Sequence, residues 1–149
     1  MATYANETSV SVSQRISNIR AMLARFGARS VGMRDDDDLG LHFIEFKFND
    51  VNIRMTFPDP EWESREIQFT EAGKKRTELQ AEAAFQQALR ARWAAAEMIL
   101  KARLVAVECG FRTFEVEFLP DIVAEHGETA AEHMENLRLE GKPMLRISA

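Results

Sequence analysis

The sequence has little cysteine, proline or glycine and no long apolar run. The single cysteine, Cys109, excludes an internal disulfide bond and fits a reducing compartment. Seven glycines and four prolines, with 46% hydrophobic residues, exclude collagen-like and disordered classes. No apolar stretch approaches the roughly 18 residues of a membrane span, and the first dozen residues lack a signal-peptide pattern. We therefore expect a cytoplasmic globular protein that does not enter a membrane.

An excess of positive charge is also missing. The net charge of the 149 residues is -5, and residues 111–149 carry four Lys or Arg against eight Asp or Glu. General nucleic-acid binders show a dominant basic field, which this chain lacks. The length suits one domain, residues 1–149, in which we expect residues 1–10 to be a flexible segment.

The first element that the pattern predicts is an amphipathic helix. Ser11 or Ser13 can cap its start, and Gly27 follows its end. Its apolar residues are spaced by three and four, and they are Ile16, Ile19, Leu23 and Phe26. The arginines off this stripe are expected to be solvated, and they are Arg15, Arg20 and Arg25.

A β-hairpin follows, with Asn49 and Asp50 as its two-residue turn. In this register the facing pairs Phe48/Val51, Phe46/Ile53, Ile44/Met55 and His42/Phe57 all lie on one face. Pro58 is expected to end the second strand, and residues 28–34 to form an earlier strand. We expect His42 to be a half-buried partner of Phe57.

A long helix is predicted from Thr77 to Glu108. Thr77 and Gln80 form a capping box, and one apolar face continues through Phe85, Leu89, Trp93, Ala96, Leu100, Leu104 and Val107. Some 31 residues would span about 46 Å, whereas a compact domain of this size is only about 38 Å across. The helix must bend or protrude, and a second copy of the chain is the commonest cover for a protruding helix. We therefore predict a homodimer.

Three further segments are less regular. The stretch "REIQFT" alternates at Ile67 and Phe69, which favours a short edge strand. Residues 114–118 fit a short helix capped by Thr113, although they also alternate like a strand. A capping box at Thr129 and Glu132 begins a last helix that ends at Gly141, with Met134 and Leu137 inward, and residues 142–149 are a tail or a final strand.

The predicted fold is α+β: an N-terminal helix, an antiparallel sheet of three to four strands with a central hairpin, a long amphipathic helix and short C-terminal helices.

Motifs for catalysis, cofactors and metals are missing from the sequence. It has no P-loop, no dinucleotide-type glycine pattern and no zinc spacing. The aspartates at residues 35–38 lack calcium-loop spacing and are interpreted as an acidic turn. His126 and His133 share no helical face because Gly127 and a helix cap separate them. We therefore predict no metal, no cofactor and no catalytic residues, and we lean towards a non-enzyme.

The clearest candidate for ligand binding is a basic segment ahead of the long helix. Lys74, Lys75 and Arg76, with Arg90 and Arg92 further along, are candidate contacts to phosphate or another anion. The same segment looks like the K-K-x-A-K motif of double-stranded-RNA-binding domains. Glu78 replaces the third lysine of that motif, however, and the four aspartates stand where a duplex would be contacted.

A second resemblance covers nearly the whole chain. The stretches "RISNIRAMLARFGA", "RARWAAAEMILKARLVAVECGFRTFEVEFLP" and "GETAAEHMENLRLEGKPML" are similar to a family of small uncharacterised bacteriophage and prophage proteins. The family's R-x-R-W and K-A-x-L-x-x-V-E-x-G-x-x-T-F-E patterns are present, while Ala94 departs from a basic family position. The resemblance implies a mobile-element accessory protein expressed in a bacterial host.

The sequence is therefore compatible with two functions. The first is a non-enzymatic phage protein that binds a host or phage protein, with inhibition of a host defence system as one version, because the acidic C-terminal third suits a basic partner. The alternative is a binder of nucleotide or nucleic acid through residues 74–76, with sequestration of a phosphorylated signal as one version.

Overall fold

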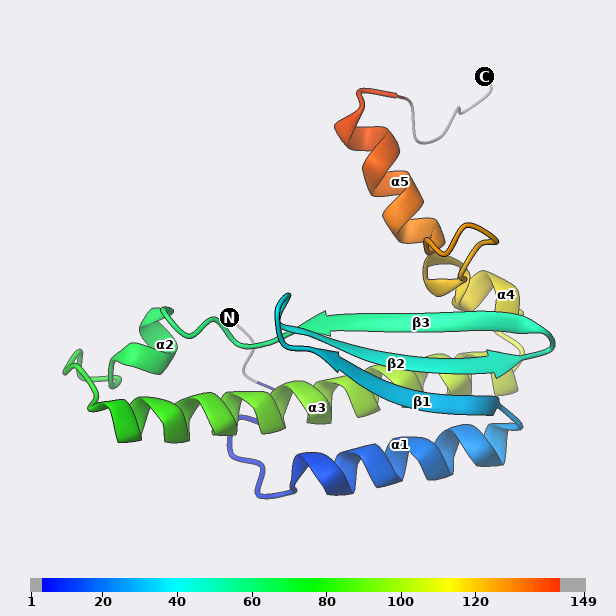
Figure 1. Ribbon diagram of the computed structural model, residues 1–149. Helices are drawn as coiled ribbons and strands as arrows, with labels where there is room; N and C mark the ends of the chain where they lie inside the picture. Colours follow the sequence, from blue (N-terminus) through cyan, green and yellow to red (C-terminus); the bar gives the residue numbers. More distant parts are fainter. Residues whose placement is uncertain (1–3, 143–149) are drawn as a thin grey trace.

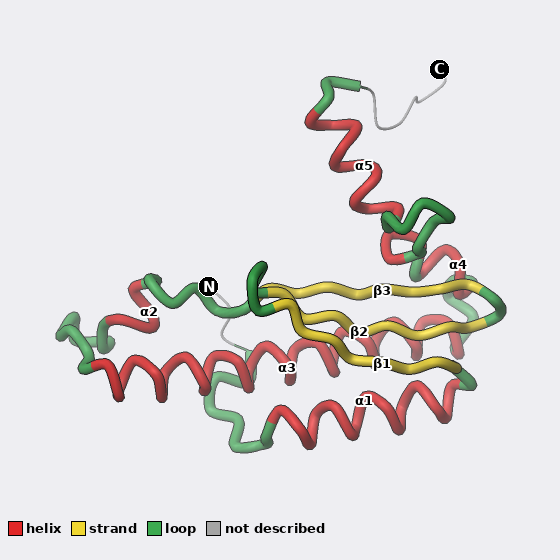
Figure 2. The backbone as a smooth tube through the Cα atoms, viewed as in Figure 1, coloured by secondary structure: helices red, strands yellow, loops and turns green. Residues whose placement is uncertain are grey.

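Two helices cover one face of a three-stranded antiparallel sheet, which makes an α+β fold as predicted (Figure 1). The computed structural model describes residues 4–142. In chain order the elements are α1 (Val12–Phe26), β1 (Arg29–Asp36), β2 (Leu41–Phe48), β3 (Val51–Pro58), α2 (Arg65–Gln68), α3 (Glu78–Glu108), α4 (Phe114–Glu117), the 3₁₀ turn η1 (Leu119–Asp121) and α5 (Ala130–Leu139). Helices α1 and α3 run side by side beneath the sheet (Figure 2).

The predicted hairpin register is confirmed at every pair. Strands β2 and β3 align Phe48 with Val51, and the pairing continues in step to the end of β3 at Pro58. Asn49 and Asp50 both have positive φ, 46° and 61°, which is the geometry of a two-residue hairpin turn. The sequence prediction of His42 against Phe57 also holds, since the two rings stack at 5.1 Å.

The core lies between the sheet and the two helices. It consists of apolar residues from α1, β2, β3, α3, the short α4 and the residue that follows α4, namely Ile19, Leu23, Ile44, Phe46, Ile53, Met55, Trp93, Ala96, Leu100, Leu104, Phe114 and Phe118. The largest side chains of the described residues that are essentially removed from solvent include Trp93 and Phe118. Apolar burial on this scale is the main source of stability.

Helix α3 begins and ends where the sequence predicts. Thr77 and Gln80 form both hydrogen bonds of the capping box, at 3.3 and 3.0 Å. Its first turns extend beyond the sheet, where α2 lies over them (Figure 1). The edge strand predicted at "REIQFT" is wrong: Ser64 precedes a single helical turn, which buries Ile67 against α3. The part of the chain that the structure describes therefore has three strands, not four.

Arg15 of α1 is less solvated than predicted, whereas Arg20 and Arg25 are exposed as predicted. Arg15 donates to Glu97 of α3 at 2.9 Å and to Thr8 at 3.0 Å, and its side chain is only 19% exposed. Gln87 of α3 donates to the carbonyls of Asn6 and Thr8, so the chain ahead of α1 lies along α3. The predicted flexibility of residues 1–10 stays a prediction.

Helix α4 confirms the helical alternative for residues 114–118. The Thr113 side chain accepts from Val116 N, and Phe114 turns into the core. Arg103 of α3 holds the next segment: its guanidinium lies over the Phe118 ring and contacts Glu117 and, at 2.7 Å, Asp121. We call residues 12–121 the body.

Residues 122–142, which we call the arm, leave the body beside β3 (Figure 1). Ile122 bridges Ile53, and Val123 N donates to Asn52 O at 2.9 Å. The capping box predicted for α5 is present, but its inward face is not: Met134 and Leu137 are half-buried, and no residue of α5 is fully buried. Helix α5 projects from the body instead of packing on it. The predicted tail or final strand, apart from Lys142, lies outside the described residues.

Candidate functional site

The basic segment lies in a tight reversal of the chain ahead of α3. Thr70 N donates to Lys74 O at 2.8 Å, Phe69 bridges Lys75, and Arg76 N donates to Gln68 O at 2.8 Å. Gly73 turns the chain with a φ of +82°, which favours glycine. The Lys74 and Lys75 side chains are exposed, and neither forms an ion pair within residues 4–142.

The three predicted arginines serve the chain's own structure. Arg76 donates to the carbonyls of Glu66 and Ile67, at 2.6 and 3.1 Å, and thereby ties α2 to the start of α3. Arg90 donates to the Gln87 side chain at 2.5 and 3.1 Å. Arg92 donates to the carbonyl of Pro58 at 3.0 Å.

These cations do not converge on one place. Arg90 lies 14 residues beyond Arg76, which is about 21 Å along a helix. Arg90 and Arg92 are two positions apart, about 200° around the helix, so they face different directions. Only Lys74 and Lys75 remain together as exposed cations, and the structure does not assemble a five-residue anion site in the described part of the chain.

A different surface, on α3, is unusual because it is exposed but carries no charge. Its residues recur at steps of three and four on the side roughly opposite the buried Leu100, and they carry no charge. We call this the outer face of α3: Ala95, Met98, Ile99, Ala102, Val105, Ala106 and Cys109. Met98, Ile99 and Val105 are 48%, 53% and 43% exposed, and Phe111, just past the helix, is 81% exposed. A contiguous apolar surface of this kind is typical of a protein-binding site.

Charges flank the outer face on one side. Lys101 and Glu108 are both exposed and lie one heptad apart, so they follow the same edge of the stripe. Small side chains at Ala95, Ala102 and Ala106 allow another helix to approach closely. This combination of a small apolar stripe and flanking charges of opposite sign is typical of helix–helix interfaces.

Arg54 links the arm to the body in addition to the backbone contacts of Ile122 and Val123. Arg54 of β3 donates to Gly127 O at 2.8 Å and to the Glu132 carboxylate at 2.9 Å. Burial alone would raise the pKa of Glu132, but the hydrogen bond from Thr129 N–H and the charge and hydrogen bond of Arg54 outweigh it. They hold the pKa of Glu132 below its ordinary value of 4.5.

Polar side chains link the three strands at the end of the sheet where β1 and β3 end and β2 begins. His42, buried among aromatic rings, has its Nδ1 2.7 Å from Asp35 and its Nε2 2.5 Å from Asp59. Asp59 N also donates to Gly40 O at 2.8 Å. One of the aspartates of the acidic turn therefore serves to hold the ends of the three strands together.

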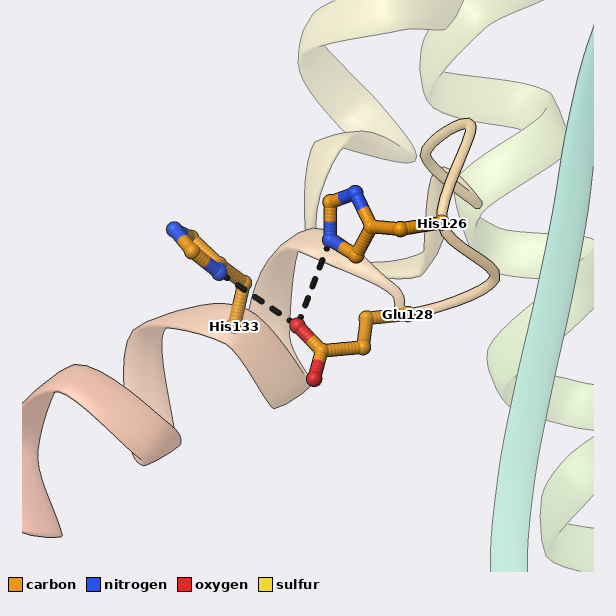
Figure 3. Close-up of side chains that lie close together, drawn as sticks. All are labelled: His126, Glu128 and His133. Carbon is orange, nitrogen blue, oxygen red and sulfur yellow. Dashed lines mark hydrogen bonds and ion pairs between the residues drawn. The ribbon is translucent and has the colours of Figure 1, made fainter.

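The structure also brings together three side chains that the sequence interpretation kept apart. His126 in the loop and His133 on α5 both point at the carboxylate of Glu128 (Figure 3). The two histidines share no helical face, as the sequence indicated, but a reversal of the chain brings their side chains together. Gly127 and the capping box at Thr129 were the sequence signal for that reversal.

Comparisons with known proteins do not indicate a function for this chain. No protein family, no curated protein and no solved structure matches this chain. Among residues 4–142, no helix combines the length and the apolar character that crossing a membrane requires.

Proposed function

We propose that this chain is a non-enzymatic accessory protein of a bacteriophage or prophage that acts, as a homodimer, by binding a protein of the host or the phage. The observation that carries the proposal is the outer face of α3: about four helical turns without a charge, exposed on a protein in which 29% of residues are charged. The resemblance in sequence supports the phage context.

The flanking charges support a second copy as the occupant of this face. In an antiparallel helix pair related by a two-fold axis, the same residue pair occurs twice. If the axis passes between Ala102 and Val105, Lys101 of one copy lies near Glu108 of the other, and the reverse pair forms on the other side of the axis. Met98 of one copy then lies across from Cys109 of the other. One surface thus complements itself in both shape and charge.

Dimerisation through α3 leaves the acidic arm and the basic reversal at residues 74–76 outside the seam. The arm lies in the acidic C-terminal third of the chain, and such a surface attracts a basic partner. Inhibition of a host enzyme or defence system is the role that we propose for this contact. The anion-binding alternative is supported only by Lys74 and Lys75, which are exposed and held in a defined turn.

The dimer is tested by measuring the mass of the untagged chain by native mass spectrometry over a concentration series. We expect twice the chain mass, and we expect Ala102→Arg to raise the dimer dissociation constant at least about tenfold because it places a charge in an apolar seam. Ala83→Arg is the matched control, since Ala83 is exposed on the same helix but off the outer face. Its dissociation constant should equal that of the unmodified chain.

Other outcomes are equally informative. A bare monomer at every concentration contradicts the dimer, and so does an Ala102→Arg variant that dimerises as tightly as the Ala83→Arg control. If protein purified from its host retains a nucleotide that the Lys74→Gln and Lys75→Gln variants lose, the anion-binding function ranks first.

A further inference from the structure

Two histidines and a glutamate meet at the base of the arm, on the exposed side of α5 (Figure 3). His126 Nε2 and His133 Nδ1 each lie 3.3 Å from the same oxygen of Glu128, Oε2. The three atoms lie within 4.8 Å of one another. All three residues line one shallow hollow, together with Asn136, Leu137 and Leu139.

The distances between these atoms suit a single small metal ion. Zinc bonds to histidine nitrogen and to carboxylate oxygen are about 2.0 to 2.2 Å long, so two ligands at the tetrahedral angle lie roughly 3.3 to 3.5 Å apart. Both His–Glu separations already have this length. The two imidazole nitrogens are at most 4.8 Å apart, and small side-chain rotations bring them to the same spacing.

Backbone hydrogen bonds hold the three ligands in place. Ala124 N donates to Glu128 O at 2.8 Å and Gly127 N to Ala124 O at 2.9 Å, which closes the loop that carries His126. Thr129, buried and bonded to Glu132 N, fixes the first turn of α5 on which His133 lies. The loop and the helix therefore cannot drift apart without breaking several bonds.

A neighbouring side chain orients the carboxylate. Asn136 Nδ2 donates to Glu128 Oε1 at 3.0 Å, so the other oxygen, Oε2, faces the two histidines. Hydrogen bonds of this kind set the direction of a metal ligand and raise its affinity. The histidine side chains are more than half exposed, which gives an ion direct access from solvent.

We propose that His126, Glu128 and His133 form a binding site for Zn²⁺, with a fourth position open to water. This departs from the prediction of no metal made on the sequence alone, and it does not depend on the proposed function. The donor set of two imidazoles and one carboxylate is one that zinc prefers and that magnesium and calcium do not. A bound ion crosslinks the loop to α5 and stiffens the arm, whose helix has no buried residue.

The site is tested by isothermal titration of the untagged, chelator-treated chain with zinc chloride, with cobalt(II) absorbance as a second readout. We expect one Zn²⁺ per chain and a cobalt spectrum of four-coordinate type. His133→Ala and Glu128→Gln should each weaken zinc binding at least tenfold, and Asn136→Leu should weaken it by about tenfold as an orienting residue. Zinc should also slow tryptic cleavage after Arg138 in α5.

Glu125→Gln is the matched control, because it removes a neighbouring carboxylate of the same loop that is not among the three ligands. It should bind zinc as tightly as the unmodified chain. The proposal is overturned if the unmodified chain takes up no zinc, or if Glu128→Gln binds as tightly as Glu125→Gln. One ion per two chains would also overturn it, since the three ligands within one chain would then not suffice.

Discussion

The body and the arm of this protein are held together by different forces. In the body, Ile19, Leu23, Ile44, Leu100 and Phe118 are completely removed from solvent. In the arm, α5 has no buried residue, and the arm contacts the body through the Arg54 bonds, the bridge between Ile122 and Ile53 and the bond from Val123 N to Asn52 O. Apolar burial resists changes of pH and salt, whereas exposed polar contacts do not.

This difference predicts that the arm opens at a lower free energy than the body. Local opening of a segment requires only the free energy of the contacts that hold it, and few apolar contacts hold the arm. The body should unfold as one cooperative unit, while the arm should open far more often without disturbing the core. Segments of low local stability are where proteins commonly place binding and switching functions.

Removal of a core side chain should have the largest effect and should act on the body. Leu100→Ala leaves a cavity at a fully buried position, and we expect it to lower the free energy of unfolding by about 3 kcal/mol. Leu139→Ala makes the same change at a residue of the arm that is 70% exposed, and we expect less than about 0.5 kcal/mol. Urea unfolding followed by circular dichroism measures both. Equal losses would show that the two regions do not differ.

Detachment of the arm should have a smaller and local effect. Arg54→Met removes the bonds to Gly127 O and Glu132 but keeps an apolar stem, and we expect a cost of about 1 kcal/mol to the docking of the arm. Hydrogen exchange by mass spectrometry should then show amides of α5 exchanging about fivefold faster, with those of α3 unchanged. Arg138→Met, in an exposed pair with Glu135 on α5, is the control and should change neither. Faster exchange throughout α3 would contradict independent opening.

Acid should have the smallest of the three effects and should also act on the arm. Because folding lowers the pKa of Glu132, the folded chain binds that proton less tightly than the unfolded chain. The contribution of Glu132 is complete above its ordinary pKa of 4.5, and it is lost as the pH falls through the lower folded value. Amide NMR signals of α5 should therefore shift in acid before those of α3. Glu132→Gln should abolish this early shift, and an early shift that persists in the variant would point to another group.

Most of the fold could be predicted from the sequence because local patterns determine it. The hairpin register follows from alternation around Asn49 and Asp50, and the bounds of α3 follow from a capping box and a sustained apolar stripe. The error at "REIQFT" arose because two apolar residues at i and i+2 were interpreted as one face of a strand. In the structure Ile67 is buried, whereas Phe69 is 37% exposed.

The surfaces were harder to predict because they depend on contacts between distant residues. The internal acceptors of Arg76, Arg90 and Arg92, which are carbonyl and amide oxygens, could not be inferred from the positions of these residues in the sequence. The neighbours of Glu128 also come from a loop and a helix, which no single periodicity relates. The outer face of α3 was not predicted either, because the apolar stripe that stands out in the sequence is the one that packs into the core, and only the packing shows which other side of the helix stays exposed.

The irregularity in β1 has a consequence for how copies of this protein can meet. The pairing of β1 with β2 shifts between Arg29 and Gly32, Ser30 has a φ of 53°, and Arg20 of α1 donates to the carbonyl of Val31 at 3.0 Å. The far edge of the sheet is occupied in part by Val123 on Asn52. A broken row of backbone donors and acceptors is a poor template for another strand. An irregular edge of this kind disfavours strand addition between copies of this phenylalanine-rich sheet, and the dimer that we propose instead pairs through the outer face of α3.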